Sequence, residues 1–285
     1  MKRIASIQDL SCIGKCSQGI ALPVLSAMGI ECAVLPTALL SAHTAFDGFV
    51  SYDLTDKLPS LIAHWQRMEL RFNAVYTGYL GSEEQIALVG DFFRRFADET
   101  TVRFVDPVMA DHGRLYAGFS DGFPQAMRRL CSHADVLTPN VTEACLLTET
   151  EYRQRHDEPY IRRLLTALLG LGAKTAVLTG LRTDETHTGV AAMTRDGSYR
   201  LFLSEYIPAV FHGTGDLFAS VCVGALTLGF APFDAVALAA GQVMRTLRAT
   251  VKDPSHRWYG VNFEEALPDL ILQLRASAKQ KEVLL

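Results

Sequence analysis

The sequence predicts an α/β protein built on a mostly parallel sheet with helices packed against it. Short apolar runs, typical of strands buried on both faces, recur along the first two thirds of the chain. Longer amphipathic segments separate these runs, and such alternation is typical of parallel sheets with right-handed crossovers. Of the 285 residues 49% are hydrophobic, which is enough to bury a large core. We find no internal repeat and no linker, so we expect a single domain over residues 1–285.

Each expected element follows from a local pattern. The strands are the apolar runs Ile4–Ile7, Cys32–Leu35, Val75–Tyr76, Val102–Val105, Val136–Leu137 and Ala176–Leu178. A helix is expected over residues 82–96, where Ser82 and Gln85 have capping-box spacing and apolar residues recur on one face. An Asp-Gly step at 196–197 predicts a late hairpin, and the chain from Gly215 onward is alanine-rich and helical.

Composition excludes several functional classes. The 31 acidic and 27 basic side chains give a net charge of −4, which excludes nucleic-acid binding through a broad basic surface. No apolar stretch is long enough to span a bilayer, and the first residues do not resemble a signal peptide. The six cysteines form no C-x-x-C pair, so we expect reduced thiols. These observations predict a soluble cytoplasmic protein that binds neither nucleic acid through a broad basic surface nor membrane.

Polar, small or acidic residues follow most of the expected strands. In open parallel sheets, ligands bind beyond the carboxyl ends of the strands. The segments at these ends are Gln8–Gly14, Ser41–Thr44, Thr77–Ser82, Asp106–Asp111, Thr138–Glu143 and Thr179–Gly180. Any one of them could be a turn or a helix cap. Their coincidence across the sheet predicts a shared polar cleft.

The strongest local signal is Gly213-Thr214-Gly215-Asp216, directly before an apolar helical run. Two glycines allow successive N–H groups to point at one anion, and the helix adds its positive N-terminal end. Asp216 could then take a proton from an attacking hydroxyl, or it could simply cap the helix. No G-x-x-x-x-G-K-[ST] motif is present, and Phe218 stands where a dinucleotide fingerprint has its third glycine.

The Gly213–Asp216 motif resembles the signature of ribokinase-like small-molecule kinases. Within them, the segments at 7–9, 41–44, 77–82, 106–109 and 138–143 resemble the vitamin B6 kinases, in order from residue 4 to about residue 250. The resemblance implies a ribokinase-like three-layer α/β/α sandwich. It also implies ATP-dependent phosphorylation of the 5′-hydroxymethyl group of pyridoxal, pyridoxamine or pyridoxine.

The resemblance also implies a role for each matched residue. Asp216 corresponds to the catalytic base, and Gly213, Thr214 and Gly215 correspond to the anion hole for the transferred phosphoryl group. The implied nucleotide-binding residues are Asp106, Asp111, Thr138, Asn140, Glu143, Thr179 and Thr214, with Asp106 and Glu143 also near Mg²⁺. The implied vitamer-binding residues are Asp9, His43, Thr44 and Tyr79. ATP and Mg²⁺ are the implied cofactors, with a monovalent cation such as K⁺ as an open addition. The resemblance further implies a homodimer, for which we expect an apolar helical surface near Leu39–Val50.

Two departures from the family pattern lie on the vitamer side. Asp9 stands where serine is frequent and Ala42 where asparagine is frequent, so the preferred vitamer stays open. One hypothesis is that Asp9 favours the cationic amine of pyridoxamine. Lys15 is expected to be solvated, Cys12 and Cys16 to fill space as small residues, and His212 to have no proton-transfer role.

Two alternative functions remain. The first is phosphorylation of hydroxymethylpyrimidine or of another ribokinase-type substrate, although the Gly-Gly-Ala-Gly run usual in hydroxymethylpyrimidine kinases is missing near Cys12–Cys16. The second is storage of pyridoxal phosphate on a degenerate kinase fold. The intact Gly-Thr-Gly-Asp and Asn-x-x-Glu elements argue against a pure binder.

Overall fold

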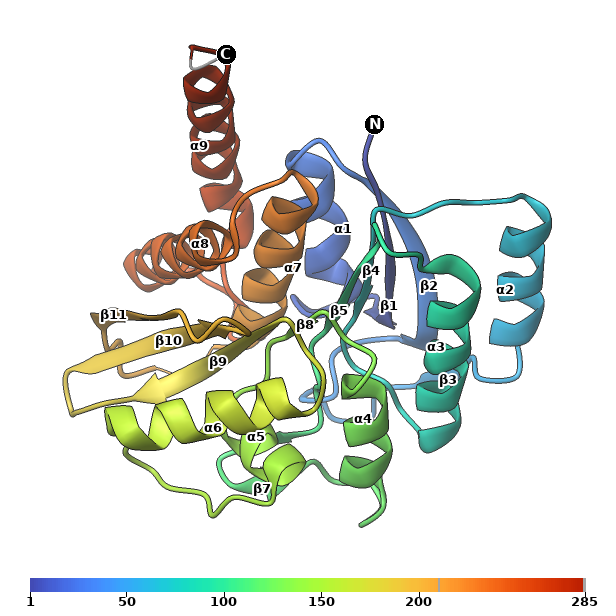
Figure 1. Ribbon diagram of the computed structural model, residues 1–285, viewed down its shortest axis with the longest axis horizontal. Helices are drawn as coiled ribbons and strands as arrows, with labels where there is room; N and C mark the ends of the chain where they lie inside the picture. Colours follow the sequence, from blue (N-terminus) through green and yellow to red (C-terminus); the bar gives the residue numbers. More distant parts are fainter. Residues whose placement is uncertain (210, 284–285) are drawn as a thin grey trace.

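A computed structural model describes residues 1–209 and 211–283 and shows a twisted central sheet with helices on both faces (Figure 1). Within the described residues the sheet has nine strands, in the order β11-β10-β9-β8-β5-β4-β1-β2-β3. The strands from β9 to β2 in this order pair in parallel, whereas β10, β11 and β3 pair antiparallel at the two edges. The predicted mostly parallel sheet is therefore confirmed.

The strand bounds extend the predicted apolar runs. The strands are β1 (Arg3–Ser11), β2 (Glu31–Leu40), β3 (Ser51–Asp53), β4 (Ala74–Thr77), β5 (Val102–Val105), β8 (Val136–Leu137), β9 (Thr175–Arg182), β10 (His187–Thr194) and β11 (Tyr199–Glu205). The β10–β11 pair is the predicted late hairpin. A separate two-stranded ribbon, β6 (Ala110–Asp111) with β7 (Arg114–Leu115), projects after β5. We call this ribbon the flap.

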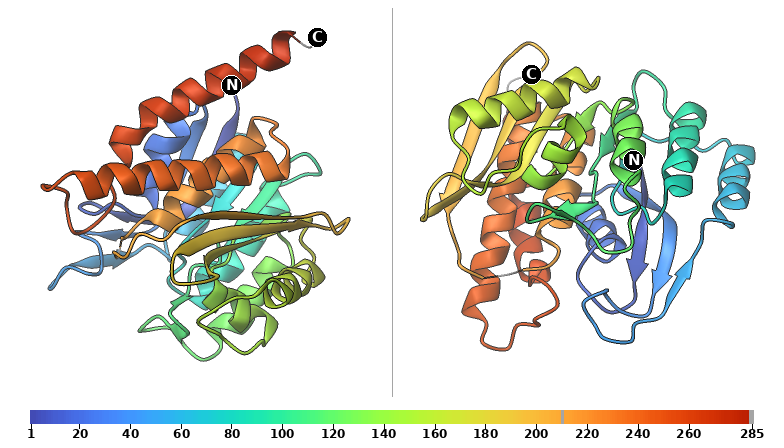
Figure 2. Two further views of the ribbon diagram at one scale, coloured as in Figure 1. Left: turned by 90° about the vertical axis from the view of Figure 1, so that its left-hand side faces the viewer. Right: turned by 90° about the horizontal axis from the view of Figure 1, so that it is seen from below.

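The helices form two layers, one on each face of the sheet (Figure 2). One layer contains α2 (Leu58–Arg67), α3 (Glu83–Phe96), α4 (Phe123–Cys131), α5 (Val141–Thr148) and α6 (Glu158–Gly170). The other contains α1 (Gln18–Ala27), α7 (Thr214–Thr227), α8 (Pro232–Lys252) and α9 (Phe263–Val283). Each layer has its own buried apolar core against the sheet. The molecule is thus the expected three-layer α/β/α sandwich.

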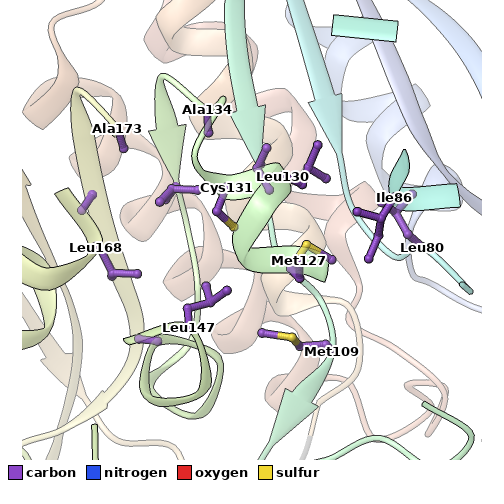
Figure 3. Close-up of a cluster of buried hydrophobic side chains, with 14 of the residues drawn as sticks. Leu80, Ile86, Met109, Met127, Leu130, Cys131, Ala134, Leu147, Leu168 and Ala173 are labelled. Carbon is purple, nitrogen blue, oxygen red and sulfur yellow. The ribbon is translucent and has the colours of Figure 1, made fainter. Parts of the chain in front are cut away.

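The core beneath α3 to α6 fixes the strand ends that carry the site. Met109, Met127, Leu130 and Leu147 lie together there in Figure 3, between β5 and its covering helices. Met109 is fully buried and lies three residues beyond Asp106. Burial of this apolar side chain stabilises the path of the chain from β5 into the flap.

Helix α3 begins as predicted but only half of the capping box forms. The Ser82 hydroxyl accepts a hydrogen bond from the Gln85 backbone N–H at 3.2 Å. The Gln85 side chain instead accepts from the Gly81 N–H at 2.7 Å and donates to the Thr37 carbonyl of β2 at 3.1 Å. Gln85 is fully buried, so its amide needs these partners from the neighbouring backbone.

The expected helical surface at residues 39–50 is wrong. Strand β2 continues to Leu40, residues 41–50 form a loop, and β3 follows at the sheet edge. The apolar side chains Phe49 and Val50 are exposed there, but on a loop. Among the described residues, no helix is long and apolar enough to cross a membrane. All six cysteines are free thiols.

Candidate active site

The candidate site lies where the strand order of the sheet reverses. From β1 the chain runs through α1 to β2 on one side, and from β4 it runs through α3 to β5 on the other. Because α1 and α3 cover opposite faces, the carboxyl ends of β1 and β4 flank a crevice, the usual ligand position in such sheets. Asp9 lies near the end of β1, Tyr79 follows β4, and Asp106 directly follows the neighbouring strand β5. The N-terminus of α7 meets them from the second helical layer.

The N-terminus of helix α7 has the features of an anion-binding site. Gly213 is its N-cap with φ 86°, and a Cβ there would collide with the Lys15 carbonyl oxygen, so the position requires glycine. Within the described part of the chain no side chain caps this helix, which leaves its first N–H groups available. An added Cβ at Gly215 would meet only open space. No neighbour among residues 1–209 and 211–283 therefore explains Gly215, whereas close approach by a phosphate would.

The carboxyl group of Asp216 projects from the first turn of α7. Burial raises its pKa to about 6, and the charge of Asp9 acts in the same direction. The backbone N–H of Ser17 partly offsets these effects through a hydrogen bond to the carboxylate. Asp216 is thus largely ionised at pH 7 but more basic than an exposed aspartate, as a general base requires.

Asp106 and Glu143 form a buried acidic pair on the far side of the crevice. Asp106 is 7% exposed and Glu143 is 3% exposed. Burial raises the pKa of both carboxyl groups, and for Asp106 the charges of Glu143 and Asp216 add to the effect. The Thr138 hydroxyl lies against Asp106 and has no closer partner among the described residues. A cation would relieve this crowding of negative charge.

The Asn-x-x-Glu element has a structural role that the sequence also allowed. Asn140 caps α5 and accepts from the Glu143 N–H at 2.9 Å, while Glu143 accepts from the Asn140 N–H at 2.8 Å, a complete capping box. The same two side chains reach the root of the flap. Glu143 accepts from the Met109 N–H at 3.1 Å, and Asn140 donates to the Ala110 carbonyl at 2.8 Å.

The remaining residues predicted on the nucleotide side lie around this pair. Asp111 is exposed on the flap, where it accepts from the His112 N–H at 2.8 Å. Thr179 in β9 donates through its backbone to Pro139 at 3.0 Å, next to Asn140. Tyr116, which the sequence analysis missed, follows the flap, and burial together with the charges of the acidic residues raises its pKa. No signal in the sequence distinguishes Tyr116 from an ordinary loop tyrosine.

Asp9 lies inside β1 rather than beyond it. The register between β1 and β2 shifts at this point, since Gln8 pairs with Pro36 and Leu10 with Leu39, so two residues of β2 face Asp9. Irregularities of this kind re-aim side chains next to functional sites. Burial raises the pKa of Asp9, against hydrogen bonds from Ser17 and Ser11. Burial and the charges of Asp9 and Asp53 raise the pKa of Tyr79, which places Tyr79 on the same side of the crevice.

The two other residues predicted on the vitamer side lie on the loop after β2. His43 is half-buried, and its ring centroid lies 4.7 Å from that of His212, just before α7. Burial and the charge of His212 lower the pKa of His43, so a neutral ring is favoured. Thr44 is exposed on the same loop. The structure thus brings together Asp9, Tyr79, Asp106, Glu143 and Asp216, with His43 at the His212 edge and Thr44 and Asp111 more exposed.

The loop between β1 and α1 forms the floor of the site. Lys15, expected to be solvated, instead lies 2.8 Å from Glu264 of α9, and its side chain is only 17% exposed. A Cβ at Gly260 would also collide with the Lys15 side chain. Cys16 is buried, and burial with the charges of Asp216 and Asp9 raises its pKa to about 12. Its thiol is therefore protonated, as packing requires.

This fold, with a glycine-flanked helix N-terminus and an aspartate at the ends of parallel strands, defines a ribokinase-like small-molecule kinase. A sequence profile of the phosphomethylpyrimidine kinase family matches residues 26–257. The chain belongs to this family.

Its relatives include several pyridoxal kinases. Pyridoxal kinase PdxY of Rubrobacter xylanophilus is 30% identical, and the match covers 93% of each chain. The crystal structure of pyridoxal kinase from Lactobacillus plantarum superposes with a TM-score of 0.87 at 33% identity, over 98% of this chain and 99% of that one. A structure described as a putative phosphomethylpyrimidine kinase from Bacteroides thetaiotaomicron, crystallised with pyridoxal, gives 0.90 at 37% identity, over 94% and 95%.

Proposed function

We propose that this protein transfers the γ-phosphoryl group of ATP to the 5′-hydroxymethyl group of a vitamin B6 vitamer, with release of ADP. The observation that carries the proposal is the start of α7, where uncapped N–H groups and the Asp216 carboxyl share one crevice with Asp9. The names of the relatives, among them a structure with pyridoxal, support the choice of substrate.

Each group in the crevice has a role in this reaction. Asp216 takes the proton of the 5′-hydroxymethyl group while the oxygen of that group attacks the γ-phosphorus of ATP. The bond between the γ-phosphorus and the bridging oxygen of ADP then breaks, and ADP leaves. The N–H groups at Gly213 to Gly215 stabilise the charge on the transferred phosphoryl group. Asp9 and Tyr79, with His43 and Thr44 on the neighbouring loop, bind the pyridine ring. Thr138, Asn140, Thr179 and the flap residue Asp111 are assigned to the nucleotide.

The donor set fits Mg²⁺. Asp106 and Glu143 offer carboxylate oxygens, which this ion prefers. No three His, Cys, Asp or Glu side chains of the described residues converge as metal ligands, so water and phosphate oxygens would complete the shell. When bound, Mg²⁺ neutralises phosphate charge and helps to align the transferred group. A monovalent cation such as K⁺ remains part of the proposal.

A coupled ATP-consumption assay tests the function. We expect turnover with pyridoxal, pyridoxine or pyridoxamine and little with hydroxymethylpyrimidine. Asp216→Ala should abolish turnover while ATP binding persists, because the residue contributes to proton removal. Turnover with hydroxymethylpyrimidine alone would favour a hydroxymethylpyrimidine kinase instead, the function to which the name of the matched family points. If none of the four substrates is turned over, storage of pyridoxal phosphate is the alternative function that remains.

We also propose that the protein works as a homodimer in the cytoplasm. Leu39, Phe49, Val50 and Tyr52 are exposed near the β3 edge of the sheet, and six free thiols fit a reducing compartment. Light scattering of the wild type and of Tyr52→Glu tests the dimer. A monomeric wild type would contradict it.

A further inference from the structure

Residues 41–50, which we call the β2 loop, carry His43 and Thr44, two of the residues assigned to the vitamer. The base of the loop is closed by two hydrogen bonds. The Ser41 N–H donates to the Val50 carbonyl, and the Val50 N–H donates to the Ser41 hydroxyl, each at 2.8 Å. The loop contains no helix or strand, so contacts with other segments must hold His43 and Thr44 in place.

The tip of the β2 loop is held by aromatic side chains from the segment between α8 and α9. The ring centroid of Phe46 lies 4.6 Å from that of Trp258 and 5.3 Å from that of Tyr259. The rings of Trp258 and Tyr259 meet edge to face at 5.8 Å. Such tilted and edge-to-face arrangements are typical of attractive aromatic pairs. We call Phe46, Trp258 and Tyr259 the aromatic cluster.

Core packing does not account for the aromatic cluster. Its three residues belong to neither of the two buried cores among the described residues, and Trp258 is 56% exposed. The cluster is instead coupled to the vitamer side of the site. The Phe46 N–H donates to the His43 carbonyl at 2.9 Å, so Phe46, His43 and Thr44 belong to one turn. The His43 N–H in turn donates to the Ile13 carbonyl, at 2.7 Å, in the loop after β1.

We propose that Trp258 is a positioning residue for the vitamer, which acts through Phe46 to keep the β2 loop docked with His43 and Thr44 at the crevice. The inference rests on the proposed function. Without the Trp258 ring the loop is docked for only part of the time, and the apparent affinity for the vitamer falls with the docked fraction. The residues assigned to ATP lie on other segments, so ATP binding does not depend on this contact.

Steady-state kinetics of four variants test the route through Phe46. In Trp258→Ala we expect the KM for the vitamer to rise about 3- to 10-fold, as for loss of an aromatic pair, with kcat and the KM for ATP within about twofold. Trp258→Phe keeps an aromatic ring and should stay near the wild type. Phe46→Ala should match Trp258→Ala, and the double variant should be no worse than either. An unchanged vitamer KM in Trp258→Ala, or additive effects in the double variant, would overturn the proposal.

Met68→Ala is the matched control. It also removes an exposed apolar side chain, but from the end of α2, where the chain leads into the start of β4 rather than its carboxyl end. Both KM values should stay at the wild-type level. An equal rise of the vitamer KM in Met68→Ala would overturn the specific role of Trp258.

Acrylamide quenching of Trp258 supplies a readout that does not depend on turnover. Trp65 and Trp258 are the two tryptophans, so Trp65→Phe leaves Trp258 as the reporter. Phe46→Leu in this background weakens docking. If docking favours the vitamer, the vitamer must favour docking, so saturating pyridoxine should lower the quenching constant about 1.5- to 2-fold, whereas ATP should not. No protection by pyridoxine would overturn the proposal. A wild type without vitamer kinase activity would overturn the proposed function itself, which is measured first and separately.

Discussion

Asp216→Asn should stabilise the fold while it removes the base. The pKa of Asp216 is raised from the ordinary value of 3.8 to about 6 in the folded protein, chiefly by burial. The folded state therefore favours the protonated carboxyl, and the charged form destabilises it as the pH rises from about 4 to above 6. The difference between the two pKa values corresponds to a loss of about 3 kcal/mol in the free energy of unfolding at pH 7. For a chain of this size that is roughly 5–10 °C in Tm.

The assay is a series of melting scans of both proteins between pH 4 and pH 8. Asparagine is close in shape to a protonated aspartate and can still accept from the Ser17 N–H. The gain in Tm should therefore be largest above pH 6 and disappear near pH 4, where the wild-type carboxyl is itself protonated. No gain at pH 7, or a gain that is equal at pH 4 and pH 7, would refute the reasoning.

Asp135→Asn is a matched control of opposite sign. Burial of Asp135 is outweighed by hydrogen bonds from Arg103 and Lys174, each at 2.9 Å, so the pKa of Asp135 is lowered. A lowered pKa contributes stability at neutral pH that is lost in acid. We expect Asp135→Asn to lower Tm at pH 7, with a smaller loss at low pH. Kinase activity should survive in this variant and vanish in Asp216→Asn.

Three further predictions concern single side chains. Gly213→Ala places a Cβ against the Lys15 carbonyl at φ 86°, so we expect loss of most turnover and about 1–3 kcal/mol of stability, measured by assay and urea unfolding; wild-type turnover would contradict the anion hole. Asp9→Ser should lower kcat/KM for pyridoxamine more than for pyridoxal or pyridoxine, because the cationic amine loses a carboxylate; an unchanged ratio across the three vitamers sinks that hypothesis. Gly260→Ala should destabilise the fold, because the added Cβ collides with the Lys15 side chain. Gly90→Ala on helix α3 has only the end of the Arg94 side chain near it and should raise the free energy of unfolding by about 0.5–1 kcal/mol. Equal effects of the two variants in urea unfolding would show that the loop carrying Lys15 can shift freely.

The strands and their ends could be predicted because their signals are local. Runs such as Val102–Val105 are apolar with little interruption, since both faces are covered, and Asp106 follows directly. The glycines around Thr214 were visible for the same reason. The roles of Asp106, Asp111 and Glu143 came from the resemblance, and the structure adds that Glu143 also completes a capping box.

The features that could not be predicted from the sequence depend on contacts between segments that are far apart in the chain. The half-formed box at Gln85 arises because Thr37 of β2 offers a buried carbonyl to the same amide. The helical reading of residues 39–50 failed because pairing with β3 extends β2 to Leu40. Ser17 carries no motif, and its positive φ shows only in the structure, where the residue joins the loop after β1 to α1. Such constraints appear only when the elements are packed.

The contacts of Lys15 with Gly213, Gly260 and Glu264 have a consequence for the synthesis of the protein. The floor of the site, formed by the loop after β1, lies between Gly213 and Gly260, and Lys15 pairs with Glu264. Synthesis proceeds from the N-terminus, so the sheet strands of this chain emerge long before its last helix. We expect a ribosome-bound chain to remain without activity until residues beyond 264 have left the exit tunnel, even though every proposed catalytic residue has been synthesised by residue 216. The segment after Asp216, which carries Gly260 and Glu264, thus delays the appearance of a working site during synthesis.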